Sequence, residues 1–332
     1  MKNNIYPKNY KSLLDLVETQ KAIKLVKDTF ERELAKELDL IRVSAPLFVE
    51  PGTGLNDNLS GYEKAVNFVV NENEKELEIV QSLAKWKRYA LKKYDIDGLY
   101  TDMNAIRKFE DTDNLHSLYV DQWDWERRLS EKDRNIRTLK SIVKKIYKAF
   151  IKTYNKVVKA YPVLETNLPK NITFITTKEL EKKYPNLSRK EREAKICRVF
   201  GVVFLMNIGG KLKDGDPHDS RAADYDDWKL NGDILFWYEP LQIAFELSSM
   251  GIRVNKESLL KQLNEKKEEY QLELTYHKMI LNDELPLSIG GGIGQSRLCM
   301  FLLKKIHIGE VQSSYWPDEE IEEFKKYNVN LL

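Results

Sequence analysis

A cluster of glycines near the end of the chain constrains the fold more than any other feature of the sequence. In the stretch Ser288-Ile-Gly-Gly-Gly-Ile-Gly-Gln-Ser-Arg297, four of five consecutive positions are glycine, and an apolar run follows. Glycines at this density are costly unless the backbone takes positive φ or another group must approach it closely. We therefore predict that this stretch is the floor of a ligand site, where a strand ends and a helix begins.

The residues around the glycines indicate the kind of ligand. The stretch lacks the Gly-Lys-Ser/Thr ending of a P-loop and the Gly-x-Gly-x-x-Gly spacing of dinucleotide sites, which excludes both. Arg297 falls in the first turn of the predicted helix, where a helix N-terminus and a guanidinium can face one anion. A polyphosphate suits that geometry. The alternative is a glycine bend used for tight packing, next to a surface arginine.

The composition is that of a globular chain with no preference for a charged partner. The 332 residues, 42% of them hydrophobic, can bury a large core, and no internal repeat divides them. We expect a single catalytic domain of the α+β class over residues 17–332, after an N-terminal extension of residues 1–16. The 54 basic and 52 acidic residues give a net charge of +2, so neither nucleic acid nor membrane is an expected partner.

Cysteines and hydropathy indicate the compartment. Cys197 and Cys299 lie in apolar helical patterns, which argues against a disulfide framework or a thiolate metal site. The polar N-terminus lacks a secretion signal, and no uncharged run approaches the ~20 residues of a membrane span. We expect a cytoplasmic protein.

Apolar periodicity predicts the elements of the first hundred residues. A long helix is predicted over 17–40, then an extended run, 40–49, in which Pro46 belongs at the edge or end of a strand. Segments 66–70 and 76–83 predict a hairpin, followed by a helix, 82–91, near Ser82 and Lys87. Lys87 alone reads more readily as an exposed lysine. Asp57, in the turn-rich segment 52–61, is either a functional loop residue or a turn former.

Two strands, predicted over 98–107 and 116–126, flank a polar loop. Along the second, alternation places Val120, Gln122, Asp124 and Glu126 on one face, opposite Tyr119, Trp123 and Trp125. Adjacent polar side chains in the middle of a sheet are costly to bury without partners. We therefore expect that face either to be wet or to hold a cationic or hydrogen-bonding ligand.

The second half of the chain adds helices, strands and a charged segment. Helices are predicted over 139–157 and 255–281, and a third helix is predicted to begin at the capping box Ser188-Arg-Lys-Glu191. Strands are predicted over 202–208, 231–237 and 243–253. The segment 209–227 contains Arg221, Tyr225 and Asp226 and is either a solvated loop or part of a site.

Two acidic side chains lie on the last pair of predicted strands. Asp233 is on the first, and on the second strict alternation places Glu246 and Ser248 on one face, with Phe245, Leu247 and Ser249 on the other. Two carboxylates together with ATP phosphates are a usual ligand set for Mg²⁺. A salt bridge to a basic side chain is the alternative for Glu246.

Several of these stretches together resemble known signature motifs. The glycine stretch resembles the third motif of class II aminoacyl-tRNA synthetases, residues 98–126 the second, and the first helix with its proline-containing strand the first, which forms the homodimer interface in that superfamily. The blocks that follow closely resemble ammonia-dependent asparagine synthetases, the aspartate–ammonia ligase family, from about residue 20 onward. They are Asp57-Asn-Leu-Ser-Gly61, Ser82-Leu-Ala-Lys-Trp-Lys-Arg88, Val120-Asp-Gln-Trp-Asp-Trp-Glu126, Ala223-Asp-Tyr-Asp-Asp-Trp228 and Phe245-Glu-Leu-Ser-Ser-Met-Gly-Ile-Arg-Val254.

The resemblance implies a fold, a reaction and a set of site residues. The implied fold is the class II aminoacyl-tRNA synthetase-like catalytic fold, a mainly antiparallel sheet flanked by helices. The implied enzyme makes asparagine from aspartate, ammonia and ATP through β-aspartyl-AMP, with Mg²⁺ and as a homodimer, and releases AMP and pyrophosphate. The implied catalytic residues are Asp57, Arg107, Gln122 and Arg297; those for aspartate are Ser82, Lys87, Gln122, Asp124, Ser249 and Arg253; those for ATP are Arg107, Tyr225, Asp226, Ser248, Gly292, Gly294 and Arg297; and those for Mg²⁺ are Asp233 and Glu246.

One stretch departs from the family, and one absence bears on the nitrogen source. Only Lys229 and Leu230 separate Trp228 from Asn231, where the family has a longer loop with glycine. Either this member is shortened here or a mobile stretch is missing from the sequence, so the roles of the preceding Tyr225 and Asp226 are the ones in question. Glutamine-dependent transfer needs a nucleophilic thiol, often at the N-terminus, but position 2 is Lys2 and both cysteines lie in apolar helical patterns. Free ammonia is therefore favoured.

Two other functions are compatible with the motifs. A truncated aminoacyl-tRNA synthetase would use the same fold and adenylate chemistry, although the chain shows neither an anticodon-binding segment nor a basic face. A non-catalytic regulatory or RNA-binding paralogue is expected to have lost Arg107, Arg297, Asp233 or Glu246, and all four are present.

Overall fold

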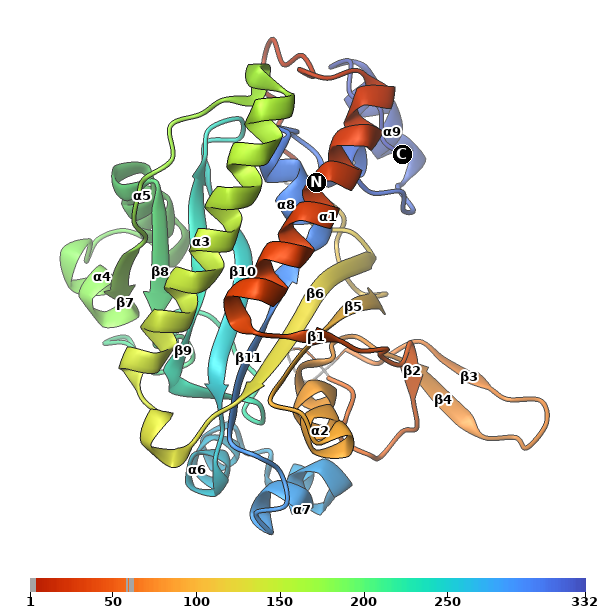
Figure 1. Cartoon of the computed structure of the whole chain (residues 1–332), viewed down its shortest axis with the longest axis vertical. Coiled ribbons are helices and arrows are strands. Elements are labelled where there is room, and N and C mark those ends of the chain that lie inside the picture. The colour runs from red at the N-terminus through yellow and green to blue at the C-terminus, as the bar shows by residue number, and fades with distance from the viewer. Residues whose placement is uncertain (1–3, 58, 60–62) are drawn as a thin grey trace.

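A computed structural model describes residues 4–57, 59 and 63–332. Within them, eight strands form the main sheet in the order β1-β5-β6-β11-β10-β9-β8-β7 (Figure 1). Only the outer pairs β1–β5 and β7–β8 are parallel, so the predicted, mainly antiparallel sheet is confirmed. The strands are β1 (Ile41–Arg42), β5 (Gly98–Ile106), β6 (Tyr119–Arg128), β7 (Thr173–Thr176), β8 (Val202–Met206), β9 (Asp226–Tyr238), β10 (Ile243–Arg253) and β11 (Ser288–Gly294).

Three helices cover one face of the sheet and enclose the largest core. They are α1 (Leu16–Leu38), α3 (Ile136–Ala160) and α8 (Gln295–Leu302), and Figure 1 shows α1 and α3 running across the strands. Phe30 of α1 and Phe150 of α3 are buried in this core. Trp123 and Trp125 reach it from β6, so the predicted alternation along that strand is confirmed.

The opposite face is covered only in part. Helix α2 (Ala84–Tyr94) packs on β5, β6 and β11, and α5 (Arg189–Phe200), which begins at the predicted Ser188 capping box, packs on β8, β9 and β10. Three further helices are α4 (Thr177–Lys183), α6 (Lys256–Lys266) and α7 (Thr275–Leu281). The single helix predicted over 255–281 is wrong, because Lys267 takes a φ of 59° and ends α6, and a short 3₁₀ segment precedes α7.

A second, three-stranded sheet projects from the main one. It contains β2 (Phe48–Val49), β4 (Glu76–Ile79) and β3 (Asn67–Val69), and the predicted hairpin is its β3–β4 pair (Figure 1). The extended run predicted over 40–49 is two strands in two sheets, since the chain leaves the first sheet before Pro46. Asn58, Ser60 and Gly61 of the predicted loop lie outside the described residues.

The two ends of the chain pack together. Tyr6 lies against Phe324 of α9 (Asp318–Lys325) and stacks on Tyr327, with ring centroids 4.8 and 4.9 Å away. No helix in the described part of the chain is long and apolar enough to cross a membrane. The single catalytic domain over residues 17–332 stays a prediction.

Candidate active site

The glycine stretch is a central strand, and its glycines make room for side chains from β6. Residues 288–294 form β11, which pairs with β6 on one side and β10 on the other and leads directly into α8, as predicted, and none of its glycines has a positive φ. A Cβ on Gly290 would lie 1.8 Å from Glu126 Oε2, and one on Gly292 would lie 2.2 Å from Gln122 Oε1. Close approach is therefore the reason for these glycines.

A cavity of about 370 Å³ opens over β6, β11 and β10, on the face that α2 and α5 leave uncovered. Every site residue predicted from the sequence lines it except Asp233. These residues are Asp57, Ser82, Lys87, Arg107, Gln122, Asp124, Tyr225, Asp226, Glu246, Ser248, Ser249, Arg253, Gly292, Gly294 and Arg297. Segments far apart in the sequence thus form one site.

Lys87 and Asp124 form a buried ion pair in the cavity floor. Lys87 Nζ lies 2.9 Å from Asp124 Oδ2 and donates to the carbonyl of Gly291 at 2.8 Å. Burial lowers the pKa of Lys87, although Asp124 acts in the opposite direction. The simpler interpretation of Lys87 as an exposed lysine is wrong, because its side chain is buried. Asp124 Oδ1 is buried without a hydrogen bond from the described residues, which leaves an acceptor for a ligand.

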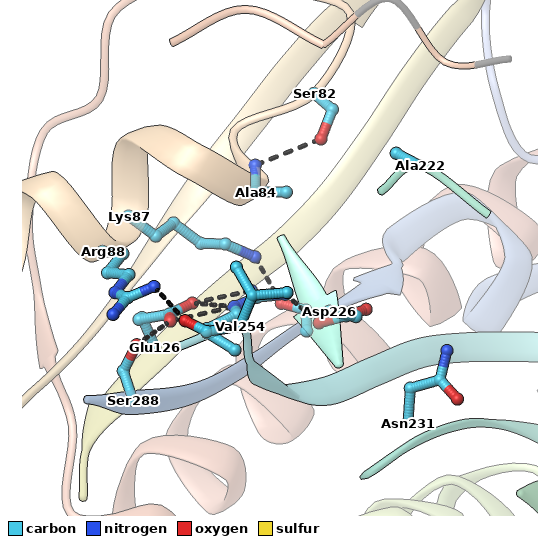
Figure 2. A network of polar contacts seen from close by, with 12 residues as sticks. Ser82, Ala84, Lys87, Arg88, Glu126, Ala222, Asp226, Asn231, Val254 and Ser288 are labelled. Carbon is cyan, nitrogen blue, oxygen red and sulfur yellow. Dashed lines mark hydrogen bonds and ion pairs between the residues drawn. The ribbon is translucent and has the colours of Figure 1, made fainter. Parts of the chain in front are cut away.

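Arg253 ties three strands together beside that pair. Its Nε and one terminal nitrogen donate to both carboxylate oxygens of Glu126, and the other terminal nitrogen lies 2.5 Å from Asp226 Oδ1. Ser288 donates to Glu126 at 2.7 Å. Figure 2 shows Glu126, Asp226 and Ser288 converging from β6, β9 and β11. The polar face of β6 is therefore dry at this point and paired with protein cations.

Two further arginines reach the cavity from different elements. Arg107 follows the last residue of β5, and its Nε donates to the carbonyl of Gln81 at 3.3 Å. Arg297 lies in the first turn of α8, as predicted, and donates to the carbonyl of Glu246 at 2.9 Å. Neither guanidinium bonds a carboxylate within the described residues, so both keep positive charge for an anionic ligand.

The side chains of β10 do not alternate as predicted. The register shifts between Glu246, which faces Leu235, and Ser248, which faces Ile234, so this β-bulge adds one residue to β10. Beyond the bulge, Ser249 is paired with Asp233 and with Gly292. Glu246 and Ser249 therefore share one face of β10, whereas Ser248, paired with Ile293, is on the other face although it also borders the cavity.

Asp233 and Glu246 are the two carboxylates predicted to bind a divalent cation, and Asp233 is paired with an arginine. A guanidinium nitrogen of Arg221 contacts Asp233 Oδ2. Burial raises the pKa of Asp233, Arg221 opposes the rise, and the nearby Glu246 carboxylate adds to it. Asp233 Oδ1 is buried without a hydrogen bond of normal geometry, beside Ser249. Two carboxylates on neighbouring strands could hold Mg²⁺. The salt bridge considered as the alternative for Glu246 is made by Asp233 instead.

A buried charged cluster lies next to Asp57 and was not predicted. Lys85 of α2 and His277 of α7 both contact Asp224 Oδ2, at 2.7 and 3.0 Å. Asp57 accepts the N–H of Leu59, as a turn former would, yet it is buried and lines the cavity. Burial raises the pKa of the Asp57 carboxyl to about 6, although Lys85 acts in the opposite direction. The sequence did not predict Lys85 as a site residue, because it is two positions from Lys87 and lies on a different side of α2.

The short connection after Trp228 lies within β9. Asn231 pairs with Gly251 and Asp226 with Arg253, so residues 227–230 bulge out of the ladder opposite Ile252. The N–H of Trp228 donates to Gln262 at 2.9 Å, which holds the bulge against α6. Tyr225 and Asp226 consequently stay at the cavity wall.

Comparison with known proteins identifies the family. Residues 17–328 match the model of the family described as aspartate–ammonia ligase. The chain belongs to that family. It is 59% identical over 332 residues to the aspartate–ammonia ligase of Clostridium tetani, covering 99% of this chain and 97% of that one. The corresponding protein of Ligilactobacillus salivarius is 56% identical, with 99% of each chain covered. The prediction that this chain is an enzyme of the aspartate–ammonia ligase family is confirmed.

Solved structures support the fold. Asparaginyl-tRNA synthetase from Pyrococcus horikoshii, complexed with asparaginyl-adenylate, superposes with a TM-score of 0.65 at 15% identity, over 90% of this chain and 70% of that one. Aspartyl-tRNA synthetase from Entamoeba histolytica gives a TM-score of 0.61 at 16% identity, over 89% and 57%. The class II aminoacyl-tRNA synthetase-like fold predicted for this aspartate–ammonia ligase family member is thus confirmed.

Proposed function

We propose that this enzyme joins aspartate to free ammonia with ATP, through β-aspartyl-AMP, and releases asparagine, AMP and pyrophosphate. The observation that carries the proposal is the content of one cavity. It combines Arg107 and Arg297, which lack carboxylate partners among the described residues, with the buried Lys87–Asp124 pair. The arginines suit phosphates, and the paired charges suit the ammonium and carboxylate groups of an amino acid.

In the first step, a side-chain carboxylate oxygen of aspartate attacks the α-phosphorus of ATP, and the bond to pyrophosphate breaks. Arg107 and Arg297 stabilise the charge that develops on the phosphoryl oxygens. Asp233 and Glu246 would hold Mg²⁺, which when bound supplies further positive charge to the phosphates. Tyr225, Asp226, Ser248, Gly292 and Gly294 are the remaining ATP contacts that we propose.

In the second step, ammonia attacks the activated carbonyl carbon, the bond between that carbon and the AMP oxygen breaks, and the nitrogen releases a proton to form the amide. We assign Asp57 and Asp124 to the ammonium group of aspartate or to the incoming ammonium. Lys87 and Arg253 bind carboxylates, and Gln122, Ser82 and Ser249 donate or accept neutral hydrogen bonds. The enzyme contributes mainly orientation of the reactants and exclusion of water from the mixed anhydride.

The nitrogen source that we propose follows from the two thiols. Cys197 and Cys299 are both fully buried in hydrophobic clusters, and neither lines the cavity. Burial raises the pKa of Cys299 to about 12, so a nucleophilic thiolate for glutamine hydrolysis is disfavoured.

We further propose a cytoplasmic homodimer that binds no nucleic acid. Exposed apolar side chains on the small sheet, Phe48 and Phe68 among them, support the dimer.

Isotope transfer tests the adenylate step. Aspartate labelled with ¹⁸O in both side-chain carboxylate oxygens should leave one ¹⁸O in AMP and one in the asparagine amide. The measurement is mass spectrometry of both products after a single turnover. Formation of ADP and phosphate, or AMP without label, would contradict the proposed intermediate.

A further inference from the structure

Arg221 lies where the proposed metal ligands meet the cavity. One terminal nitrogen contacts Asp233 Oδ2, and the other lies 3.3 Å from Asp219 Oδ2. The Arg221 side chain is 15% exposed and lines the cavity together with Glu246 and Arg297. Among the described residues, the guanidinium of Arg221 is thus the cation that contacts Asp233.

The two members of this pair differ in how firmly the fold holds them. Asp233 is on β9, which is hydrogen-bonded to β8 and to β10 on its two sides, so the backbone that carries its carboxylate is fixed by the sheet. Arg221 lies in the segment 213–225, which contains neither helix nor strand. Side-chain rotation can therefore move the guanidinium while the carboxylate stays in place.

The pair also leaves bonding capacity unused. Asp233 Oδ1 and Arg221 Nε are both buried without a hydrogen bond of normal geometry within the described residues. A buried pair normally satisfies such atoms, because each unmade hydrogen bond has a free-energy cost. The arrangement therefore suits a second set of partners: a cation with oxygen affinity for Asp233, and an anion for Arg221.

We propose that Arg221 is an exchangeable counter-cation, which neutralises Asp233 in the nucleotide-free enzyme and leaves it when a divalent cation and ATP bind. A divalent cation bound to Asp233 would lie beside the guanidinium on the same carboxylate, and repulsion between the two positive charges weakens the contact with Arg221. Once displaced, Arg221 lies in the same cavity as Arg297, where its planar fork suits the outer phosphates of ATP. This inference rests on the proposed function, because it takes Asp233 and Glu246 as the metal ligands.

Binding of Mn²⁺ alone to the nucleotide-free protein tests the exchange without turnover. Removal of the competing cation in Arg221→Gln should tighten Mn²⁺ binding at least tenfold over the wild type, measured from the electron paramagnetic resonance signal of free Mn²⁺. The gain should vanish in the double variant Arg221→Gln/Asp233→Asn, and Arg221→Lys, which keeps a cation, should show less of it. Wild-type affinity in Arg221→Gln would overturn the proposal.

A matched control and a folding readout complete the test. Arg189→Gln removes an arginine that lies 2.9 Å from Asp214, an exposed carboxylate in the same segment, 213–225, as Arg221. This variant should not change Mn²⁺ affinity. If Arg221→Gln folds poorly, Mn²⁺ should restore its folding, since a ligand that binds only the native state stabilises it. A variant that stays unfolded in millimolar Mn²⁺ counts against the proposal. Tight Mn²⁺ binding by a protein that makes no asparagine would instead reject only the proposed function.

Discussion

The guanidinium of Arg253 holds both carboxylate oxygens of Glu126, with Nε 2.9 Å from Oε1 and a terminal nitrogen 2.7 Å from Oε2. Both side chains are almost inaccessible to water, and a Cβ on Gly290 would lie 2.5 Å from the same arginine. The pair therefore joins β6 and β10 across a strand that must be glycine. Stability and the geometry of the site depend on the same contact.

Loss of this contact should be costly. Glu126→Gln should lower the free energy of unfolding by about 3–5 kcal/mol, because it leaves the buried Arg253 with one fewer counter-charge. Urea denaturation followed by circular dichroism measures the change. Glu50→Gln, which breaks the exposed Lys75–Glu50 pair, is the matched control and should leave stability within error. A loss below about 1 kcal/mol for Glu126→Gln would contradict a stabilising pair.

The glycine floor predicts a steric effect at Gly292. In Gly292→Ala the new Cβ would lie 2.2 Å from Gln122 Oε1 and 2.9 Å from Asp124 Oδ1, so both side chains must shift. We expect a loss of stability of about 1–3 kcal/mol from overpacking and at least tenfold weaker aspartate binding by calorimetry. Gly210→Ala is the control, since the nearest atom to its Cβ would be 3.8 Å away. Unchanged aspartate affinity in Gly292→Ala would remove Gln122 and Asp124 from the substrate site.

Asp57 should give stability a pH dependence of defined sign. Burial raises its pKa from 3.8 to about 6, so between these values the folded protein binds more protons than the unfolded chain. The free energy of unfolding must then fall as pH rises through this window. Asp57→Asn keeps the acceptor for Leu59 N–H and should abolish the fall.

A shift of one pKa unit corresponds to about 1.4 kcal/mol. Between pH 4 and pH 7, the free energy of unfolding of Asp57→Asn should therefore rise by up to about 3 kcal/mol relative to that of the wild type. Urea titrations at a series of pH values measure the difference. Asp111→Asn, at an exposed position in the loop after Arg107, is the control. Parallel stability curves for the wild type and Asp57→Asn would show that burial does not perturb this carboxyl.

Arg297 should act on the chemical step. Arg297→Ala removes a cation that is fixed by the first turn of α8 and aimed at the proposed phosphate site, so kcat should fall by about 10²–10³. Steady-state pyrophosphate release measures the rate, and Arg137→Ala, an exposed arginine at the start of α3, should leave it unchanged. A rise in KM for ATP at constant kcat would mean that Arg297 only binds the nucleotide.

Periodicity and motif resemblance predict much of this molecule, and their failures have physical causes. The long helices, the hairpin and the two faces of β6 follow from apolar spacing, since each buries one side. The bulge after Glu246 changes the faces of Ser248 and Ser249, and alternation carries no signal for an inserted residue.

Tertiary pairing is the other limit. Asp233 of β9 contacts Arg221, which lies in a segment without regular structure. Lys85, Asp224 and His277 come together from three separate parts of the chain. No local pattern encodes such contacts. All but one of the predicted site residues nevertheless line one cavity, because most of the motifs lie on β6, β10, β11 or an element beside them.

Product formation from defined nitrogen donors tests the proposed reaction and its nitrogen source together. The purified protein, with ATP, Mg²⁺ and aspartate, is supplied with ammonium, with glutamine or with neither, and asparagine and pyrophosphate are quantified. We predict asparagine and pyrophosphate in equal amounts with ammonium, and no asparagine with glutamine or without a donor. Asparagine formed from glutamine would contradict the inference that the buried thiols of Cys197 and Cys299 are not nucleophiles. Failure to form asparagine from ammonium would contradict the proposed function itself.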